Sequence, residues 1–127
     1  NLFIVLLEII NFKNGEGKEM TISIEEVCKK KSEELSIVHA RISELRQIID
    51  GFDDDANYKT IEEAAPRLGD AILLQVDNER RIQFLRTERP DDPSPVIENF
   101  DHAFWEIKQN LKQAQNILKT NQNQANA

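Results

Sequence analysis

The sequence predicts an all-α protein: an antiparallel three-helix bundle with coiled-coil-like packing. Two stretches of the chain repeat apolar residues at spacings that alternate between four and three, and such a pattern lines up on one side of an α-helix. A third helical segment lies between them, and short connections favour antiparallel neighbours. The chain has 127 residues, enough for one domain with a single core, and we expect the bundle to occupy residues 20–120.

The first helix is expected to begin near Ile24 and to end at Gly51. Ser23 and Glu26 have the spacing of a capping box, in which two side chains satisfy backbone N–H groups at a helix start. Lys31 is the one interruption in the apolar stripe, whose other members are Ile24, Cys28, Leu35, Val38, Ile42, Leu45, Ile49 and Phe52. A stripe of this kind needs a partner helix to cover it.

The second helix is expected to start near Ile61 with a bend, or afresh at Pro66, and to reach about Glu88. Thr60 and Glu63 repeat the capping-box spacing, and proline is tolerated in the first turn of a helix but kinks its interior. The preceding residues 50–59 are acidic and rich in turn formers, so we expect them to form a connection. The face expected to point to the core contains Ile61, Ala65, Leu68, Ile72 and Val76.

The same helix carries more apolar residues than one face can hold. At 100° per residue, Leu73 with Phe84 and Leu74 with Leu85 point in other directions. Burying one such side chain contributes roughly 1.5–3 kcal/mol, so a few uncovered positions suffice to drive association. We therefore predict that these four residues bind a partner and that the chain forms a homo-oligomer through this helix.

The third helix is expected to run from Ser94 to about Lys119. Ser94 followed by Pro95 is a favourable helix start, because serine caps the first turn and proline fits its first position. The apolar stripe of this helix contains Ile97, Phe100, Phe104, Ile107, Leu111, Ala114 and Leu118. Residues 121–127 are all Asn, Gln or Ala and are expected to form a disordered polar tail.

Residues 1–19 form an apolar N-terminal extension. Its apolar part, residues 2–12, is shorter than the roughly 20 residues that a membrane span requires. One interpretation is that the extension is not native and that the protein begins at Met20, because residues 15–19, which precede it, can all be encoded by purine-only codons that resemble a ribosome-binding site. The other is that it forms a short fourth element, a helix or a strand, that covers an apolar face.

The net charge of −7 argues against a nucleic-acid partner, which requires clustered positive charge. Arginines gather near the end of the second helix, but Asp77 is placed to pair with Arg81, and the helix dipole favours cations there. The four arginines are Arg80, Arg81, Arg86 and Arg89. A single cysteine, Cys28, excludes an intrachain disulfide and indicates a reducing, cytoplasmic setting; no membrane partner is expected.

No catalytic residues, metal ligands or cofactor are predicted. Asp53, Asp54 and Asp55 resemble the start of a calcium loop, but its sixth position is Tyr58 instead of glycine and its twelfth is Ala64 instead of glutamate. The two histidines also lack the preceding glutamate of carboxylate-bridged metal sites in bundles. We interpret the three aspartates as an acidic loop exposed to solvent.

Trp105 does not fit the stripe of the third helix. Its neighbours three and four residues away are Asp101, His102, Lys108 and Gln109, so a large apolar side chain lies on a polar face. Tryptophan on such a face is typical of a residue that anchors a partner, and we assign Trp105 and His102 to the predicted binding site. The alternative is that a loop or the N-terminal segment covers the ring.

These features together predict a non-enzymatic protein–protein interaction module, a small acidic helical bundle of the adaptor or chaperone-like kind. The alternative is an immunity or inhibitor-type protein, in which the acidic loop of Asp53, Asp54 and Asp55 binds the basic surface of a nuclease or toxin. Ionic strength discriminates between the two, because binding that is steered by charge weakens with salt and apolar docking does not.

Overall fold

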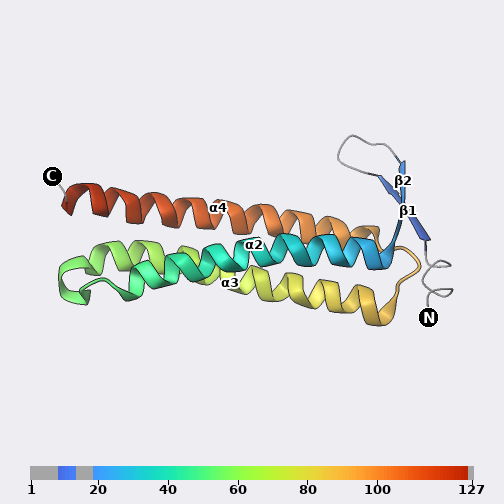
Figure 1. Cartoon of the computed structure of the whole chain (residues 1–127), viewed down its shortest axis with the longest axis horizontal. Helices are drawn as coiled ribbons and strands as arrows, with labels where there is room; N and C mark the ends of the chain where they lie inside the picture. The colour runs from blue at the N-terminus through green and yellow to red at the C-terminus, as the bar shows by residue number, and fades with distance from the viewer. Residues whose placement is uncertain (1–8, 14–18, 126–127) are drawn as a thin grey trace.

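The computed structural model describes residues 9–13 and 19–125, with the side chains of residues 23–121. It confirms an all-α three-helix bundle, in which α2 (Ile24–Asp50), α3 (Asp54–Glu88) and α4 (Ser94–Ala125) lie side by side along an elongated molecule (Figure 1). Consecutive helices run in opposite directions. The hairpin that precedes them, β1 (Ile9–Lys13) and β2 (Glu19–Ser23), lies at one end of the bundle, and α4 ends at the other (Figure 1).

Helix α2 has the predicted start and end. The Ser23 hydroxyl accepts a hydrogen bond from the backbone N–H of Glu26 at 3.2 Å, and the N–H of Gly51 bonds the carbonyl of Gln47 at 3.1 Å. Most of the predicted stripe is buried, with Ile49 and Phe52 half-buried at its end. The sequence therefore identified the core face of this helix correctly.

Lys31, the interruption in that stripe, reaches from α2 to α4. Its Nζ lies 2.7 Å from Asp101 Oδ1 and 5.4 Å from the centre of the Phe100 ring. The aliphatic part of the side chain continues the apolar stripe while its charged end meets a carboxylate at the edge of the bundle. One lysine is therefore compatible with the packing of α2 against α4.

Helix α3 begins earlier than predicted, because the acidic residues cap it instead of forming a connection. Asp53 Oδ1 accepts hydrogen bonds from the N–H groups of Asp55 at 2.9 Å and Ala56 at 3.2 Å. The backbone leaves helical geometry at Asn57, where φ is −120°, and α3 then continues through Pro66. A start at Ile61 or at Pro66 was therefore wrong, and the bend lies at Asn57.

The face of α3 that points to the core also differs from the prediction. Val76 is 37% exposed and Ala65 is exposed, whereas Leu68 is buried. The buried positions have the same alternating spacing of four and three as the other helices, and they are Ala64, Leu68, Ala71, Gln75, Asn78, Ile82 and Leu85. Two alanines and two amides made this stripe hard to recognise in the sequence.

The two buried amides have hydrogen-bond partners. Asn78 donates from Nδ2 to the carbonyl of Phe100 on α4 at 3.1 Å, and its Oδ1 accepts from Arg81 Nη1 at 2.7 Å. Gln75 Nε2 lies 2.9 Å from His39 Nδ1 on α2. Because buried amides are tolerated only when they are paired, these contacts favour one alignment of the three helices.

Helix α4 begins at Ser94 as predicted, and its apolar stripe is buried except for Phe104, which is half-buried. It ends at Ala125 instead of near Lys119, so residues 121–125, which we expected to be disordered, are helical. Asn121 contacts the start of α3: its Oδ1 accepts from Thr60 Oγ1 at 2.8 Å, and its Nδ2 donates to Asn57 Oδ1 at 3.2 Å. Residues 126 and 127 lie outside the described residues.

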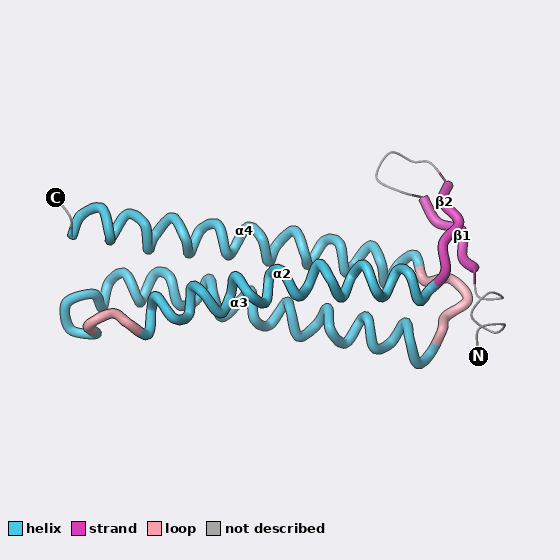
Figure 2. The backbone as a smooth tube through the Cα atoms, viewed as in Figure 1, coloured by secondary structure: helices cyan, strands magenta, loops and turns pink. Residues whose placement is uncertain are grey.

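The hairpin includes part of the predicted N-terminal extension. Its antiparallel register pairs Ile10 with Ile22 and Phe12 with Met20. Figure 2 shows both strands beside the start of α2 and near the connection between α3 and α4. A short strand was one of the two interpretations of the extension; the rest of it, residues 1–8 and 14–18, lies outside the described residues.

Candidate protein interaction surfaces

Large apolar side chains are exposed on the outer face of α3. Leu73 is 66% exposed and Phe84 is 43% exposed, and both belong to the predicted partner-binding set. They are separated by 11 positions, about three helical turns, and so point in nearly the same direction, away from the buried stripe. The structure thus brings these two predicted residues together on one face.

The other two apolar residues predicted for this site are placed differently. Leu85 is 1% exposed and is part of the core, and Leu74 is half-buried against the core. The assignment of Leu85 to a partner site was wrong, because the core face of α3 is rotated relative to the one chosen from the sequence. Leu74 lies at the margin of the core, so Leu73 and Phe84 are the members of the set that α3 presents to solvent.

Trp105 projects from the outer face of α4 with 56% of its surface exposed. His102 stacks on it, with the ring centres 6.5 Å apart and the ring planes 20° apart, and His102 Nε2 lies 2.9 Å from Glu106 Oε1. No described segment covers the indole, which disfavours the alternative of a buried, structural tryptophan. Trp105 and His102 therefore form one exposed aromatic pair.

The three aspartates predicted to form an acidic loop lie at the start of α3. Asp53 is the N-cap residue, and Asp54 and Asp55 lie in the first helical turn, where the helix dipole favours negative charge. All three are exposed. Since the carboxylate of Asp53 accepts two backbone hydrogen bonds, its position is explained by helix capping.

A groove between α2 and α3 was not foreseen from the sequence. Its volume is about 440 Å³, and its floor is formed by Leu35 and Ile82. Polar side chains form its walls: Ser32, Ser36, His39, Gln75, Glu79, Gln83 and Arg86. The contact of Gln75 with His39 at 2.9 Å joins the two walls and supports the alignment of α2 and α3, while Gln75 also donates to Glu79 on its own helix at 3.2 Å.

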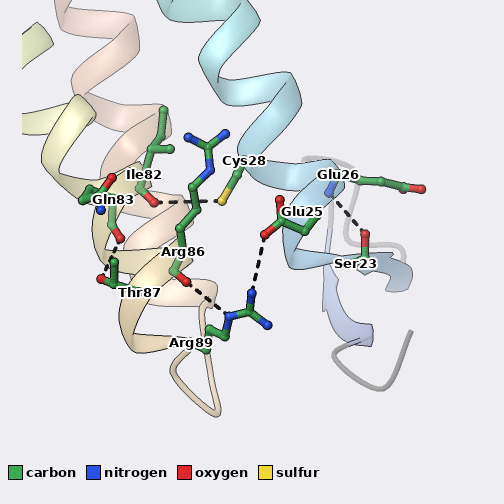
Figure 3. A network of polar contacts seen from close by, with 9 residues as sticks. All are labelled: Ser23, Glu25, Glu26, Cys28, Ile82, Gln83, Arg86, Thr87 and Arg89. Atoms are coloured by element: carbon green, nitrogen blue, oxygen red, sulfur yellow. Dashed lines mark hydrogen bonds and ion pairs between the residues drawn. The ribbon is translucent and has the colours of Figure 1, made fainter. Parts of the chain in front are cut away.

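Cys28 lies near the end of this groove, among contacts that join the start of α2 to the end of α3 (Figure 3). Its Sγ is 4.0 Å from the carbonyl oxygen of Ile82, and the side chain is completely buried. Burial raises the pKa of the Cys28 thiol above its ordinary value, and the positive charge of Arg86 offsets part of the rise. The thiol is therefore a small apolar packing group at neutral pH.

The arginines near the end of α3 do not form one basic patch. Arg81 donates to Asn78 instead of pairing with Asp77, and Arg89 Nη2 lies 3.8 Å from Glu25 Oε1 on α2 (Figure 3). Arg86 lines the groove between α2 and α3. Arg81 and Arg89 thus contact other groups of the bundle, whereas Arg80 is exposed on the outer face of α3.

In the part of the chain that the structure describes, no three His, Cys, Asp or Glu side chains are grouped as metal ligands. None of the described helices is both long enough and apolar enough to cross a membrane.

In comparisons with known proteins, no family model, no curated protein sequence and no solved structure matches this chain.

Proposed function

We propose that this protein is a non-enzymatic protein–protein interaction module, of the adaptor or chaperone-like kind, that associates with itself and binds a second protein. The observation that carries the proposal is the exposure of Leu73, Phe84 and Trp105, three large apolar side chains on the outer faces of α3 and α4. The bundle packs other residues in its core, so the fold itself does not account for these three. Apolar side chains that remain exposed on a packed domain are typical of contact sites.

Trp105 is the proposed anchor for the second protein. An exposed indole can bury a large area on binding with little loss of rotamer freedom, which is why tryptophan often dominates binding energy. His102 stacks against one side of the ring, so the indole is already restrained in the free protein. A partner with an apolar pocket at the centre of its interface would suit this pair.

The experiment compares wild type with Trp105→Ala in affinity capture from cells that express the protein. We expect at least one protein to be retained by wild type and lost from the variant. The thermal melting temperature should be the same within about 2 °C, because truncation of an exposed side chain costs little stability. Ile37→Ala is the matched control, since Ile37 is 72% exposed but lies on α2.

Two outcomes would contradict the proposal. If Trp105→Ala lowers the melting temperature by more than about 5 °C, the indole stabilises the fold and is no anchor. If both variants retain the same proteins as wild type, the α4 surface is not used for binding.

The inhibitor-type alternative has less support, because helix capping already accounts for the position of Asp53 without a basic partner. It predicts that any captured protein dissociates as salt rises, and that Asp54→Asn together with Asp55→Asn weakens binding. The apolar proposal predicts a complex that survives 1 M salt, a concentration at which the Debye length is about 3 Å. A cytoplasmic location remains part of the proposal, since a thiol is retained at the single cysteine.

A further inference from the structure

The outer face of α3 carries a second set of residues with regular spacing. Leu73, Asp77, Arg80 and Phe84 follow one another at intervals of four, three and four positions. At 100° per residue they lie within about 60° of one another around the helix axis, opposite to the buried stripe, and they extend over about 16 Å. All four are exposed, so this face is a continuous strip of side chains with an apolar residue at each end and two charges between.

The order of these residues is symmetrical about a midpoint between Asn78 and Glu79. If a second α3 helix runs in the opposite direction with its midpoint at the same place, Leu73 of one copy meets Phe84 of the other. Asp77 then meets Arg80, and the symmetry makes each of these contacts twice. An interface in which one surface contacts an identical surface is the usual arrangement of homodimers.

The charges distinguish this arrangement from the parallel one. In a parallel pair Asp77 would face Asp77 and Arg80 would face Arg80, and such like-charge contacts oppose association. Within the described part of the chain, the Asp77 carboxylate accepts no hydrogen bond, the Arg80 guanidinium donates none, and neither group forms an ion pair. Both groups are therefore available to a second copy.

We propose that α3 pairs with α3 of a second copy of this chain, antiparallel, around a two-fold axis that passes near residues 78 and 79. This inference rests on the self-association that is part of the proposed function, and it adds the surface, the direction and the register. The strip spans three turns, which is short for a stable interface, so the dimer is reversible and forms as the protein concentration rises.

Charge reversal tests the pairing in the full-length chain by sedimentation velocity over a range of concentrations. We expect Asp77→Arg and Arg80→Asp each to raise the dissociation constant by about tenfold or more, because each creates two like-charge contacts. The double variant, with both substitutions, restores opposite charges and should recover wild-type association within about threefold. One reversal lowers the net negative charge and the other raises it, so net charge cannot explain a loss shared by both.

Cysteine cross-linking tests the direction. In a Cys28→Ala background, Leu73→Cys and Phe84→Cys are prepared separately, mixed, and oxidised with glutathione disulfide. The antiparallel pair places the two introduced thiols opposite each other, so the mixed disulfide should form about tenfold faster than either homodisulfide. Faster formation of a homodisulfide would overturn the proposed direction.

The other outcomes also have defined meanings. A wild-type chain that remains monomeric at every concentration overturns this inference, while the Trp105 surface is still tested by affinity capture. A dimer that tolerates both single reversals but is lost in Trp105→Ala overturns the α3 pairing and supports association through α4. Circular dichroism of each variant shows whether the bundle is intact, which we expect because the substituted positions are exposed.

Discussion

At the scale of single residues, Cys28 and Trp105 have opposite environments. Cys28 is fully buried beside Ile82, whereas Trp105 is more than half exposed. The sequence predicted the burial of Cys28, which falls in an apolar stripe. For Trp105, which falls outside one, it left open whether a partner or a segment of the same chain covers the ring. It did not anticipate the partners of Asn78 and Gln75, since a single amide gives no indication of which helix it will meet.

The pH dependence of stability reports the burial of Cys28. Its folded-state pKa is raised, so the unfolded chain loses the thiol proton at a lower pH than the folded chain does. The contribution of this group is fully present below the pKa of an unfolded cysteine, about 8.5, and is lost as pH rises through the folded pKa. We expect wild type to lose more stability between about pH 8 and 10 than Cys28→Ala does, measured by urea denaturation at each pH.

The change in stability with pH is measured separately for wild type and for Cys28→Ala, and these two changes are then compared. Cys28→Ala also removes buried volume, so it should be less stable than wild type at pH 7, and only the change with pH is compared. Equal slopes for the two proteins would show that the thiol ionises as readily in the folded state as in the unfolded one.

At the scale of elements, the helices with apolar stripes were predicted well and α3 was not. In α2 and α4 the buried positions are mostly Ile, Leu, Val and Phe, so the most apolar face of each helix is also its core face. In α3 the core face includes Ala64, Ala71, Gln75 and Asn78, while Ala65 and Val76 are exposed, so hydrophobicity indicated the wrong rotation. The regular spacing of four and three was present, but polar and small residues occupied it.

Proline in the interior of α3 leads to a test at this scale. Pro66 has no N–H to donate to the carbonyl of Glu62, and its ring crowds that carbonyl. We expect Pro66→Ala to raise the free energy of unfolding by about 2 kcal/mol, which is the helix-interior cost of proline reduced by its stiffening of the unfolded chain. Urea denaturation measures the change.

Arg67→Ala is a suitable control, because Arg67 is the exposed neighbour in the same turn and should change stability by less than about 0.5 kcal/mol. A Pro66→Ala variant no more stable than wild type would mean that the helix accommodates the proline without strain. In that case the bend at Asn57 already relieves the start of α3.

At the scale of the whole molecule, the core is contained in the three helices. Every buried residue of the hydrophobic core cluster lies on α2, α3 or α4. The bundle could be predicted from the sequence because the spacing of apolar residues and the capping residues indicate the helices. The short connections between the helices then indicate that neighbours are antiparallel. The groove between α2 and α3 could not be predicted, because it depends on side chains at the margins of two stripes, where the sequence pattern is weakest.

Removal of residues 1–19 tests how far the bundle depends on the hairpin. A chain that begins at Met20 keeps the Ser23 cap and the whole described core, and a two-stranded hairpin contributes little stability by itself. We expect the same helical content per molecule by circular dichroism and a cooperative thermal transition. Loss of cooperativity would show instead that the hairpin completes the fold.

The positions of the hairpin and of Ala125 at opposite tips follow from an odd number of antiparallel helices (Figure 1). With 32 residues, α4 alone is about 48 Å long. Domains fused before β1 and after α4 would be held apart by a rigid spacer of about that length. The bundle would then set the distance between the two fused domains as well as link them.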